Sequence, residues 1–251
     1  MTVQMVSESN SHDLAILACS DLTDCAQKAD IDYRIVGGVM SAMYRSGNPT
    51  LITRTRMTSD VDIGIHCQAV TADQLDHQLR ACGYVKVDGN RYVQNASIGQ
   101  KTIDVLVTQE EHKRHNIGVG AITADAVEGL HLALARPGVH ATIEAALHSE
   151  EKTVTFTAAF PDLGSAIVIK AAAWAARHSW KDAVDVIDLV RIFTAHQRTI
   201  NDLPGRHSSR QKTQKTLRQL ARNSTKQLTA AECTLLAAFA QPTDTHITRG
   251  H

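Results

Sequence analysis

The order of short β-prone runs and helical spacings in the first half of the chain is the strongest constraint on its fold. A β-prone run at residues 33–36 stops at Gly37-Gly38, and helical spacing of apolar residues follows over 39–44. Strict alternation at Val61–Ile65 predicts a strand with one buried face. The remaining elements expected here are helices over 13–29 and 72–82, a loop over 46–59, and strands near 84–87, 91–95 and 102–107.

The second half of the chain has a different pattern. From residue 126 onward the spacing is mostly helical, interrupted by one β-branched run at 153–157. Helices are expected over 161–177, 181–193 and 230–240. We therefore predict a mixed α+β fold, with a core domain of residues 1–125 that holds a mixed sheet and a mostly helical domain of residues 126–251 that completes the site.

Composition excludes several classes of protein. Lys plus Arg and Asp plus Glu are 26 each, so a globally basic surface is excluded and contact with nucleic acid requires a local patch. The five cysteines form no C-x-x-C pair, and the 13 histidines show no zinc-type spacing. No apolar run reaches the ~20 residues that span a bilayer, and residues 1–10 lack signal-peptide features. We expect a cytoplasmic protein with reduced thiols and no membrane partner.

A pair of carboxylates at the start of the alternating strand is the most informative motif. Side chains alternate faces along a strand, so Asp60 and Asp62 are expected on one side. Their mutual repulsion is tolerable if the site is solvated, protonated or neutralised by a cation. Mg²⁺ suits such oxygen ligands, since it prefers one or two carboxylates plus substrate phosphates. The alternative is a solvated polar face on an edge strand.

Two further features fit the same site. Gly37-Gly38 lies between a strand and a helix, where exposed amides and the positive helix end can hold phosphate oxygens; the alternative is a tight turn that needs a positive φ. Asp104 lies opposite the apolar face of its own strand. It joins the acidic pair if that strand lies beside Val61–Ile65, and is otherwise an ordinary edge-strand acid.

A late run of charges predicts a cationic helix face. Lys170, Trp174 and Arg177 are spaced so that they share one face of a helix, which suits a triphosphate. Asp182 and Asp185 share a face of the next helix and can pair with these cations and orient them. The alternative is an interhelical salt-bridge network with Trp174 in the core.

This order of motifs resembles the nucleotidyltransferase fold shared with DNA polymerase β. More closely, the motifs resemble the AbiEii/AbiGii toxin family of bacterial nucleotidyltransferases over residues 33–193. The matching residues are Gly37-Gly38, Arg56, Thr58, Asp60, Asp62-Ile63, Lys170, Arg177, Lys181-Asp182 and Asp185. The resemblance implies a polymerase-β-like core and transfer of a nucleotide from a nucleoside triphosphate (NTP) to an acceptor hydroxyl, with Mg²⁺ or Mn²⁺.

The resemblance also implies roles for individual residues. Asp60 and Asp62 would bind the metal ion. The family does not uniformly require Asp104, which, if its strand lies close, completes the metal site or accepts the proton of the acceptor. Lys170 would contact the nucleotide phosphates, and Asp182 or Asp185 would be a catalytic-site acid. The other nucleotide-site residues would be Gly37, Gly38, Arg56, Thr58 and Arg177. Relatives often carry Thr or Ser where this chain has Val39, and Ser41 is the candidate substitute.

Family members act as toxins in toxin–antitoxin pairs, so the resemblance implies RNA, especially the 3′ end of tRNA, as acceptor and a cognate antitoxin as partner. The stretch from Arg206 to Lys226 holds seven Lys or Arg and no acid, so it is either an RNA contact or a solvated helix face with Leu217 and Leu220 packed inward. Two alternatives to this function are a catalytically silent binding protein and a transferase that acts on a protein or small-molecule hydroxyl.

Overall fold

The computed structural model describes residues 1–52, 54, 56–66, 69–108, 117–119, 122–223 and 228–241. It has a mixed α+β fold, as predicted. The strands are β1 (Thr2–Val6), β2 (Tyr33–Val36), β3 (Val61–Ile65), β4 (Val85–Asp88), β5 (Arg91–Ala96), β6 (Gly99–Thr108), β7 (Ile117–Val119), β8 (Ile122–Val127), β9 (Val139–Ala146) and β10 (Thr153–Phe160). The helices are α1 (Asn10–Lys28), α2 (Gly37–Ser46), α3 (Ala69–Ala81), α4 (Leu130–Leu134), α5 (Leu163–Arg177), α6 (Trp180–Ala195), α7 (His207–Asn223) and α8 (Ala230–Phe239), with 3₁₀ turns at Pro49–Leu51 and Ile200–Asp202.

The larger sheet is mixed. Its main path runs β2-β3-β6-β5-β4, and β8 joins on β6. β2 is antiparallel to β3, whereas β3 and β6 are parallel. Apolar residues of β3 and β6 alternate into the core, with Ile63 and Val105 fully buried. β3 therefore lies between β2 and the second half of β6.

A second sheet joins strands from the two predicted domains, 1–125 and 126–251. β1 pairs in parallel with β9, and β10 pairs antiparallel with β9. The β-branched run predicted at 153–157 lies in β10, but its hairpin partner β9 was not predicted. The sequence of β9 is rich in Ala and carries Glu144, which favour a helix, and pairing on both sides overrides that preference. The boundary predicted near residue 125 falls inside β8.

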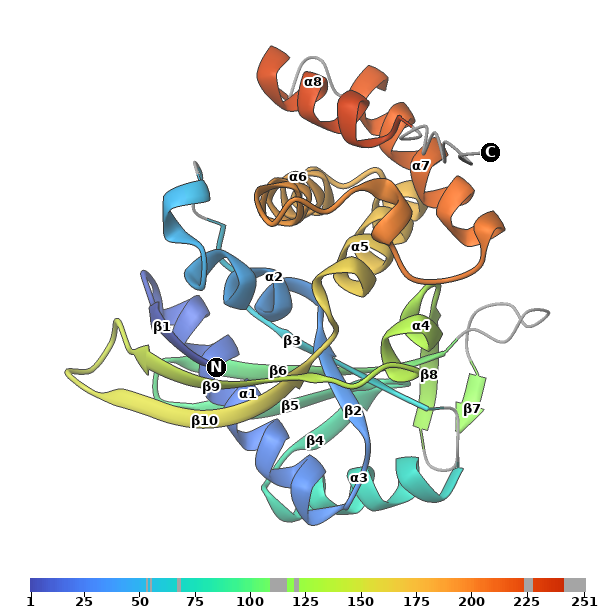
Figure 1. Cartoon of the computed structure of the whole chain (residues 1–251). Coiled ribbons are helices and arrows are strands. Elements are labelled where there is room, and N and C mark those ends of the chain that lie inside the picture. The colour runs from blue at the N-terminus through green and yellow to red at the C-terminus, as the bar shows by residue number, and fades with distance from the viewer. Residues whose placement is uncertain are drawn as a thin grey trace, which may run out of the picture.

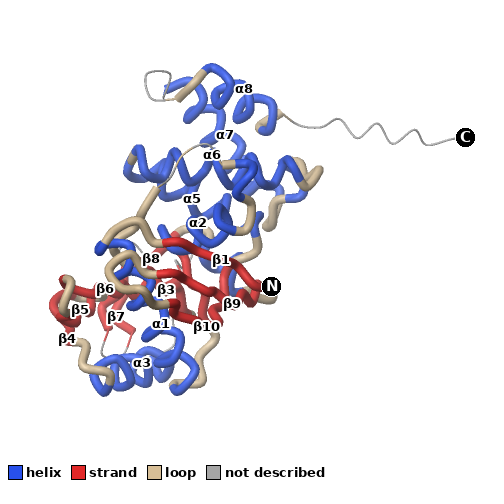
Figure 2. The backbone as a smooth tube through the Cα atoms, turned by 90° about the vertical axis from the view of Figure 1, so that its left-hand side faces the viewer, coloured by secondary structure: helices blue, strands red, loops and turns tan. Residues whose placement is uncertain are grey.

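The helices lie at two ends of the molecule, and α5 to α8 gather at one of them (Figure 1). Figure 1 shows α5 to α8 stacked beyond α2, with α1 and α3 at the opposite end of the strands. Figure 2 shows the same division from the side. α2 contacts α5 and α6 as well as β2 and β3, so it connects the sheet to the helical end. No helix of the described residues is long and apolar enough to cross a membrane.

Candidate functional site

Two carboxylates are placed side by side by the pairing of β3 with β6. Asp62 on β3 is the direct register partner of Asp104 on β6. Asp60 immediately precedes β3. Val36, the last residue of β2, pairs with Asp62 on the other side. The strand that carries Asp104 therefore lies beside β3, as the prediction of a third neighbouring carboxylate requires.

The glycine pair allows the acidic segment to approach the start of α2. Gly37 has a φ of +64°, and a Cβ there would lie 1.7 Å from Oδ2 of Asp62. A Cβ on Gly38 would lie 2.3 Å from Oγ1 of Thr58. Both distances are too short for any side chain, so a residue larger than glycine would displace the acidic segment. At Gly37, both the positive φ and the short distance to Asp62 therefore require glycine.

Ser41 is not placed to contact a nucleotide, and this prediction is corrected. Ser41 is a buried residue of α2 and is 1% exposed. The hydroxyl donates to the carbonyl oxygen of Gly37, one helical turn earlier, at 3.3 Å. The side chain of Val36, which precedes the helix, makes no capping hydrogen bond. The first backbone amides of α2, rather than a hydroxyl, are therefore the donors that the helix start offers to an anion.

Thr58 and Arg56 hold the acidic segment from two directions. Oγ1 of Thr58 donates to Oδ1 of Asp60 at 2.9 Å, which fixes the first carboxylate. NH1 of Arg56 lies 3.3 Å from Oδ2 of Asp185 on α6. Thr58 thus acts on the carboxylate pair directly, and Arg56 ties the loop to the helical end of the molecule.

The pKa of Asp62 depends on its burial and on the charges around it. Burial, followed by the negative charge of Asp60, raises the pKa of Asp62 to about 7. The charge of Asp104 acts in the same direction, whereas Lys170 and Arg177 act in the opposite one. The contacts link the two sides as well, since Arg56, four residues before Asp60, lies 3.3 Å from the same carboxylate of Asp185 that Lys170 contacts at 2.7 Å. The carboxylates of the sheet and the cations of α5 therefore face a common region.

The predicted pairing between α5 and α6 is confirmed. Nζ of Lys170 lies 2.7 Å from Oδ2 of Asp185 and 3.6 Å from Oδ1 of Asp182. The guanidinium of Arg177 donates to both oxygens of Asp182, at 3.0 and 2.9 Å through NH2. Lys170 is buried and Arg177 is exposed. Asp182 and Asp185 therefore orient one cation inside the protein and one at its surface.

Asp185 also receives a cation that sequence reasoning missed. The buried Arg45 of α2 donates to Oδ1 of Asp185 through NH2 and to Oδ2 of Asp188 through Nε at 2.7 Å. Burial alone would raise the pKa of Asp185, but the charges of Lys170, Arg45 and Arg56 outweigh it and lower the pKa. Two features of the sequence could have indicated the contacts of Arg45. One is a single Arg in a mostly apolar helix, and the other is that the three-residue spacing of Asp182 and Asp185 continues to Asp188.

The interhelical salt-bridge alternative is also visible in the structure. Trp174, between Lys170 and Arg177 on α5, is 3% exposed and packs in the core. Its ring meets that of His178 edge to face, with centroids 4.9 Å apart. Part of the α5 face that was predicted to bind a triphosphate is therefore buried against the core. Arg177 is the cation of this face that is exposed to solvent.

Asp104 is engaged by a cation of its own. Arg91, at the start of β5, donates to Oδ1 of Asp104 at 2.8 Å and to Oδ2 at 2.7 Å. Each carboxylate oxygen of Asp104 therefore already accepts one hydrogen bond from Arg91. Among the residues that the structure describes, no group of three or more His, Cys, Asp or Glu side chains is arranged to hold a metal ion. A three-carboxylate site that includes Asp104 does not fit this arrangement.

Asp60 and Asp62 remain as oxygen donors for a divalent cation. Burial raises the pKa of Asp62 and the negative charge of Asp60 adds to this effect, so the ionised pair is costly without a cation. Mg²⁺ or Mn²⁺ accepts carboxylate ligands, and Mg²⁺ commonly takes one or two of them with waters and substrate phosphates. The pair fits such an ion, whereas a closed cage of protein ligands is not formed.

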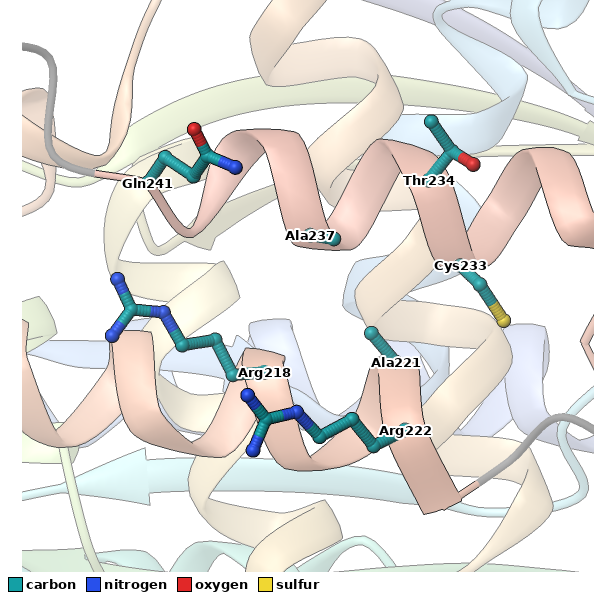
Figure 3. Close-up of a pocket in the computed structure, with 7 residues that line it drawn as sticks. All are labelled: Arg218, Ala221, Arg222, Cys233, Thr234, Ala237 and Gln241. Atoms are coloured by element: carbon teal, nitrogen blue, oxygen red, sulfur yellow. The ribbon is translucent and has the colours of Figure 1, made fainter.

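The basic segment forms α7, with Leu217 and Leu220 buried as predicted. Some of its cations have partners: Arg210 donates to the carbonyl of Asn201, and Lys212 donates to Glu128 at 2.7 Å. Lys226 lies outside the described residues. Two other cations, Arg218 and Arg222, line an open groove of about 670 Å³ between α7 and α8. Figure 3 shows both guanidinium groups extending along this groove.

Among the residues that the structure describes, no acidic side chain lines this groove. Glu232 of α8 is buried, and Oε2 accepts from Arg54 at 2.6 Å while Oε1 lies 3.7 Å from Arg191. Arg218 and Arg222 are one turn apart, and like charges at this spacing repel. The groove between α7 and α8 is therefore a local basic site on a chain with no net charge.

The chain matches no known family model, and no curated protein shows significant sequence similarity to it. The structure brings most of the predicted site residues to one region. The sheet supplies Asp60 and Asp62, the start of α2 supplies backbone amides, and α5 supplies Lys170 and Arg177. Any function assigned to this region therefore depends on how these residues are arranged, and not on similarity to a known protein.

Proposed function

We propose that the protein is a nucleotidyltransferase. It transfers a nucleoside monophosphate from an NTP to an acceptor hydroxyl, which attacks the α-phosphorus in line while pyrophosphate leaves. The observation that carries this proposal is that the acidic segment meets α5 at one carboxylate. Arg56 and Lys170 both lie against Asp185. Gly37 lets Asp62 approach the start of α2. Negative and positive groups on two sides of one region match a metal-bound triphosphate.

The cationic side of the site holds the triphosphate in this proposal. Arg177 is exposed and its fork is oriented by Asp182, so it meets phosphate oxygens at the surface. Lys170 is held by Asp185 and adds positive charge from within. The free amides of α2 add donors at the positive end of a helix. Together these groups offset the charge of the leaving pyrophosphate.

The acidic side positions the acceptor in this proposal. Thr58 orients Asp60, and Gly37 lets the carboxylate of Asp62 lie against the start of α2. Asp60 and Asp62 would hold Mg²⁺, which supplies positive charge where the attacking and leaving oxygens become negative. Arg91 donates to both oxygens of Asp104, and the register of β3 on β6 places Asp104 beside Asp62. Asp104 therefore contributes negative potential rather than a ligand oxygen.

Transfer is tested with NTPs labelled in the α-phosphate, Mg²⁺ and total RNA. The proposal predicts incorporation of label that Asp62→Asn reduces by at least about 100-fold, as expected for removal of one strong electrostatic contributor. Asp24→Asn, at an exposed position of α1, is the control and retains activity. No incorporation into any acceptor by the wild type would refute the proposal.

We propose RNA as the acceptor, with the 3′ end of tRNA as the leading candidate. The unneutralised Arg218 and Arg222 support a phosphate-rich acceptor, because phosphate contacts by Arg supply much of the affinity of RNA-binding proteins. Digestion of the labelled product decides the class: ribonuclease releases the label from RNA, and protease releases it from a protein. Label that resists both and stays in the small-molecule fraction assigns a small acceptor.

We propose a cytoplasmic toxin as the biological role, with a cognate antitoxin as partner. Modification of tRNA ends halts translation, so expression of the wild type should arrest bacterial growth while Asp62→Asn should not. Equal growth in the two cultures would contradict the toxin role and leave the transfer reaction to its own test.

A silent nucleotide-binding module is the second candidate. Lys170 is 3% exposed and already paired with Asp185, which is the arrangement of a structural ion pair. A silent module would bind NTP and Mg²⁺ in calorimetry without transferring label to RNA, protein or small molecules.

A further inference from the structure

Two cysteines from separate helices are in direct contact at the end of the molecule opposite α5 to α8. Cys25 lies in the last turns of α1, and Cys82 directly follows α3. The thiol of Cys25 donates to Sγ of Cys82 at 3.1 Å, although the residues are 57 positions apart in sequence. This separation is about 1 Å longer than the ~2.05 Å of a disulfide bond. The two sulfur atoms therefore need only a small movement to bond.

The backbone around this pair is fixed by several hydrogen bonds. The amide of Cys82 donates to the carbonyl of Gln78 at 3.0 Å, and the thiol of Cys25 approaches the same oxygen at 3.6 Å. The side chain of Gln94 on β5 donates to the carbonyl of Cys82 at 2.6 Å. The contact of the thiols is thus a property of how α1, α3 and β5 pack, and not of a free surface loop.

The two thiols differ in their access to solvent. Cys25 is fully buried, and burial raises its pKa to about 12. Cys82 is partly exposed. Cys82 is therefore the thiol that meets a small oxidant, and Cys25 is the protected thiol behind it.

We propose that Cys25 and Cys82 are a modification site that forms a reversible disulfide in the presence of a peroxide. The thiolate of Cys82 attacks one peroxide oxygen, the O–O bond breaks, and Cys82 becomes a sulfenic acid while the second oxygen leaves as water. The sulfur of Cys25 then attacks the sulfur of Cys82. The S–S bond forms, the S–O bond breaks, and the oxygen leaves as water with the proton of Cys25. The two thiols lose two electrons and two protons, and one peroxide becomes two waters.

The disulfide closes a ring that contains the acidic part of the candidate site. The chain between Cys25 and Cys82 includes Gly37, Gly38 and the Asp60–Asp62 pair. A cross-link of this length restricts the unfolded chain, so the oxidised protein is the more stable form. The expected increase in Tm is roughly 6–15 °C. The proposal does not depend on the transferase activity, since it concerns the opposite face of the sheet.

The test oxidises the full-length protein with hydrogen peroxide and blocks remaining thiols before proteolysis. We expect a peptide pair linked through Cys25 and Cys82 in mass spectrometry, loss of the link with dithiothreitol, and a higher Tm before reduction. Cys233→Ser is the matched control, because Cys233 lies on α8 away from the pair, and it should retain the link and the increase in Tm. Cys82→Ser should show neither.

Three outcomes would overturn the proposal. One is over-oxidation of Cys82 to a sulfinic acid with Cys25 still reduced. Another is a disulfide that joins Cys25 or Cys82 to a different cysteine. The third is a link that forms without an increase in Tm, which would remove the stabilising role. Mapping of the wild type decides the first two even if Cys82→Ser fails to fold.

Discussion

Nζ of Lys170 lies 2.7 Å from Oδ2 of Asp185, and the other oxygen of the same carboxylate accepts from Arg45. One buried aspartate on α6 thereby joins α5 to α2, which are more than 100 positions apart in sequence. The cation expected to neutralise a triphosphate is therefore held by a carboxylate of the following helix, and Arg45 of the helix that starts at the glycine pair holds the same carboxylate.

Replacing Asp185 should test how much its ion pairs stabilise the fold. Asp185→Asn leaves Lys170, Arg45 and Arg56 without their shared anion, and we expect the free energy of unfolding to fall by about 3–5 kcal/mol. Urea denaturation measures the change, with Asp24→Asn as the exposed control. The lowered pKa of Asp185 also means that its contribution is lost as pH falls through that pKa, below about pH 4. Equal urea midpoints for Asp185→Asn and wild type would show that Asp185 is dispensable.

The raised pKa of Asp62 predicts a stability effect of opposite sign. Between about pH 4 and pH 7 the folded protein retains a proton that the unfolded chain has released, so this group makes the fold less stable as pH rises. Asp62→Asn removes the charge, and we expect it to be more stable than the wild type at pH 8 by on the order of 2 kcal/mol, with little difference at pH 4. Denaturation of both proteins across this range without divalent ions provides the check. A variant that is less stable at pH 8 would contradict the proposed crowding of negative charge.

A divalent cation should reverse that destabilisation. Mg²⁺ favours the ionised pair, so it should raise the Tm of the wild type at pH 8 and have little effect on Asp60→Asn or Asp62→Asn. Asp104→Asn is the informative comparison, because both oxygens of Asp104 already accept from Arg91, and it should retain the response to Mg²⁺. Thermal melts with increasing MgCl₂ measure this. Loss of the response in Asp104→Asn alone would assign the ion to a different set of carboxylates.

The glycine pair should tolerate no side chain. Gly37→Ala places a Cβ 1.7 Å from Oδ2 of Asp62 at a positive φ, so we expect loss of transferase activity and a fall in stability of about 2 kcal/mol or more. Gly47→Ala at the other end of α2 is the control, because a Cβ there would approach no atom closer than 3.5 Å. If Gly37→Ala is as active as Gly47→Ala, the glycine turn is not required for the activity of the site.

The groove between α7 and α8 should contribute salt-dependent affinity for RNA. Arg218→Gln and Arg222→Gln should each lower the slope of log K against log salt by about 1, because each removes one phosphate contact. Lys212→Gln removes a cation that is already paired with Glu128 and should change the slope less. Filter binding of tRNA over a salt series measures the slopes. A wild-type affinity that does not depend on salt would exclude this groove from RNA binding.

Local patterns predicted the part of the fold that carries the acidic side of the site. The bounds of β2 and β3 agree with the structure, because the glycine pair and the strict alternation at residues 61–65 are local signals. The strands β1 and β9 were missed, since each depends on a partner far away in sequence. The short helix α4 was missed as well, because one turn of helix has too few residues to show a period.

Spacing predicted which charges pair but not all of their partners. The three-residue separation of Asp182 and Asp185 predicted their contacts with α5. It did not predict Arg45, which reaches the same carboxylate only because α2 packs against α6. The Arg91–Asp104 pair was missed for the same reason, since it depends on the register of β5 against β6.

The most direct measurement of the central claim compares two positions of the label in the same NTP. Purified protein, Mg²⁺ and tRNA are incubated with NTP labelled either in the α-phosphate or in the γ-phosphate, and the tRNA is then isolated. Nucleotidyl transfer predicts label in tRNA from the α-position only, with the γ-label recovered in pyrophosphate and both signals absent from Asp62→Asn. Label in tRNA from the γ-position, or none from either position, would contradict it.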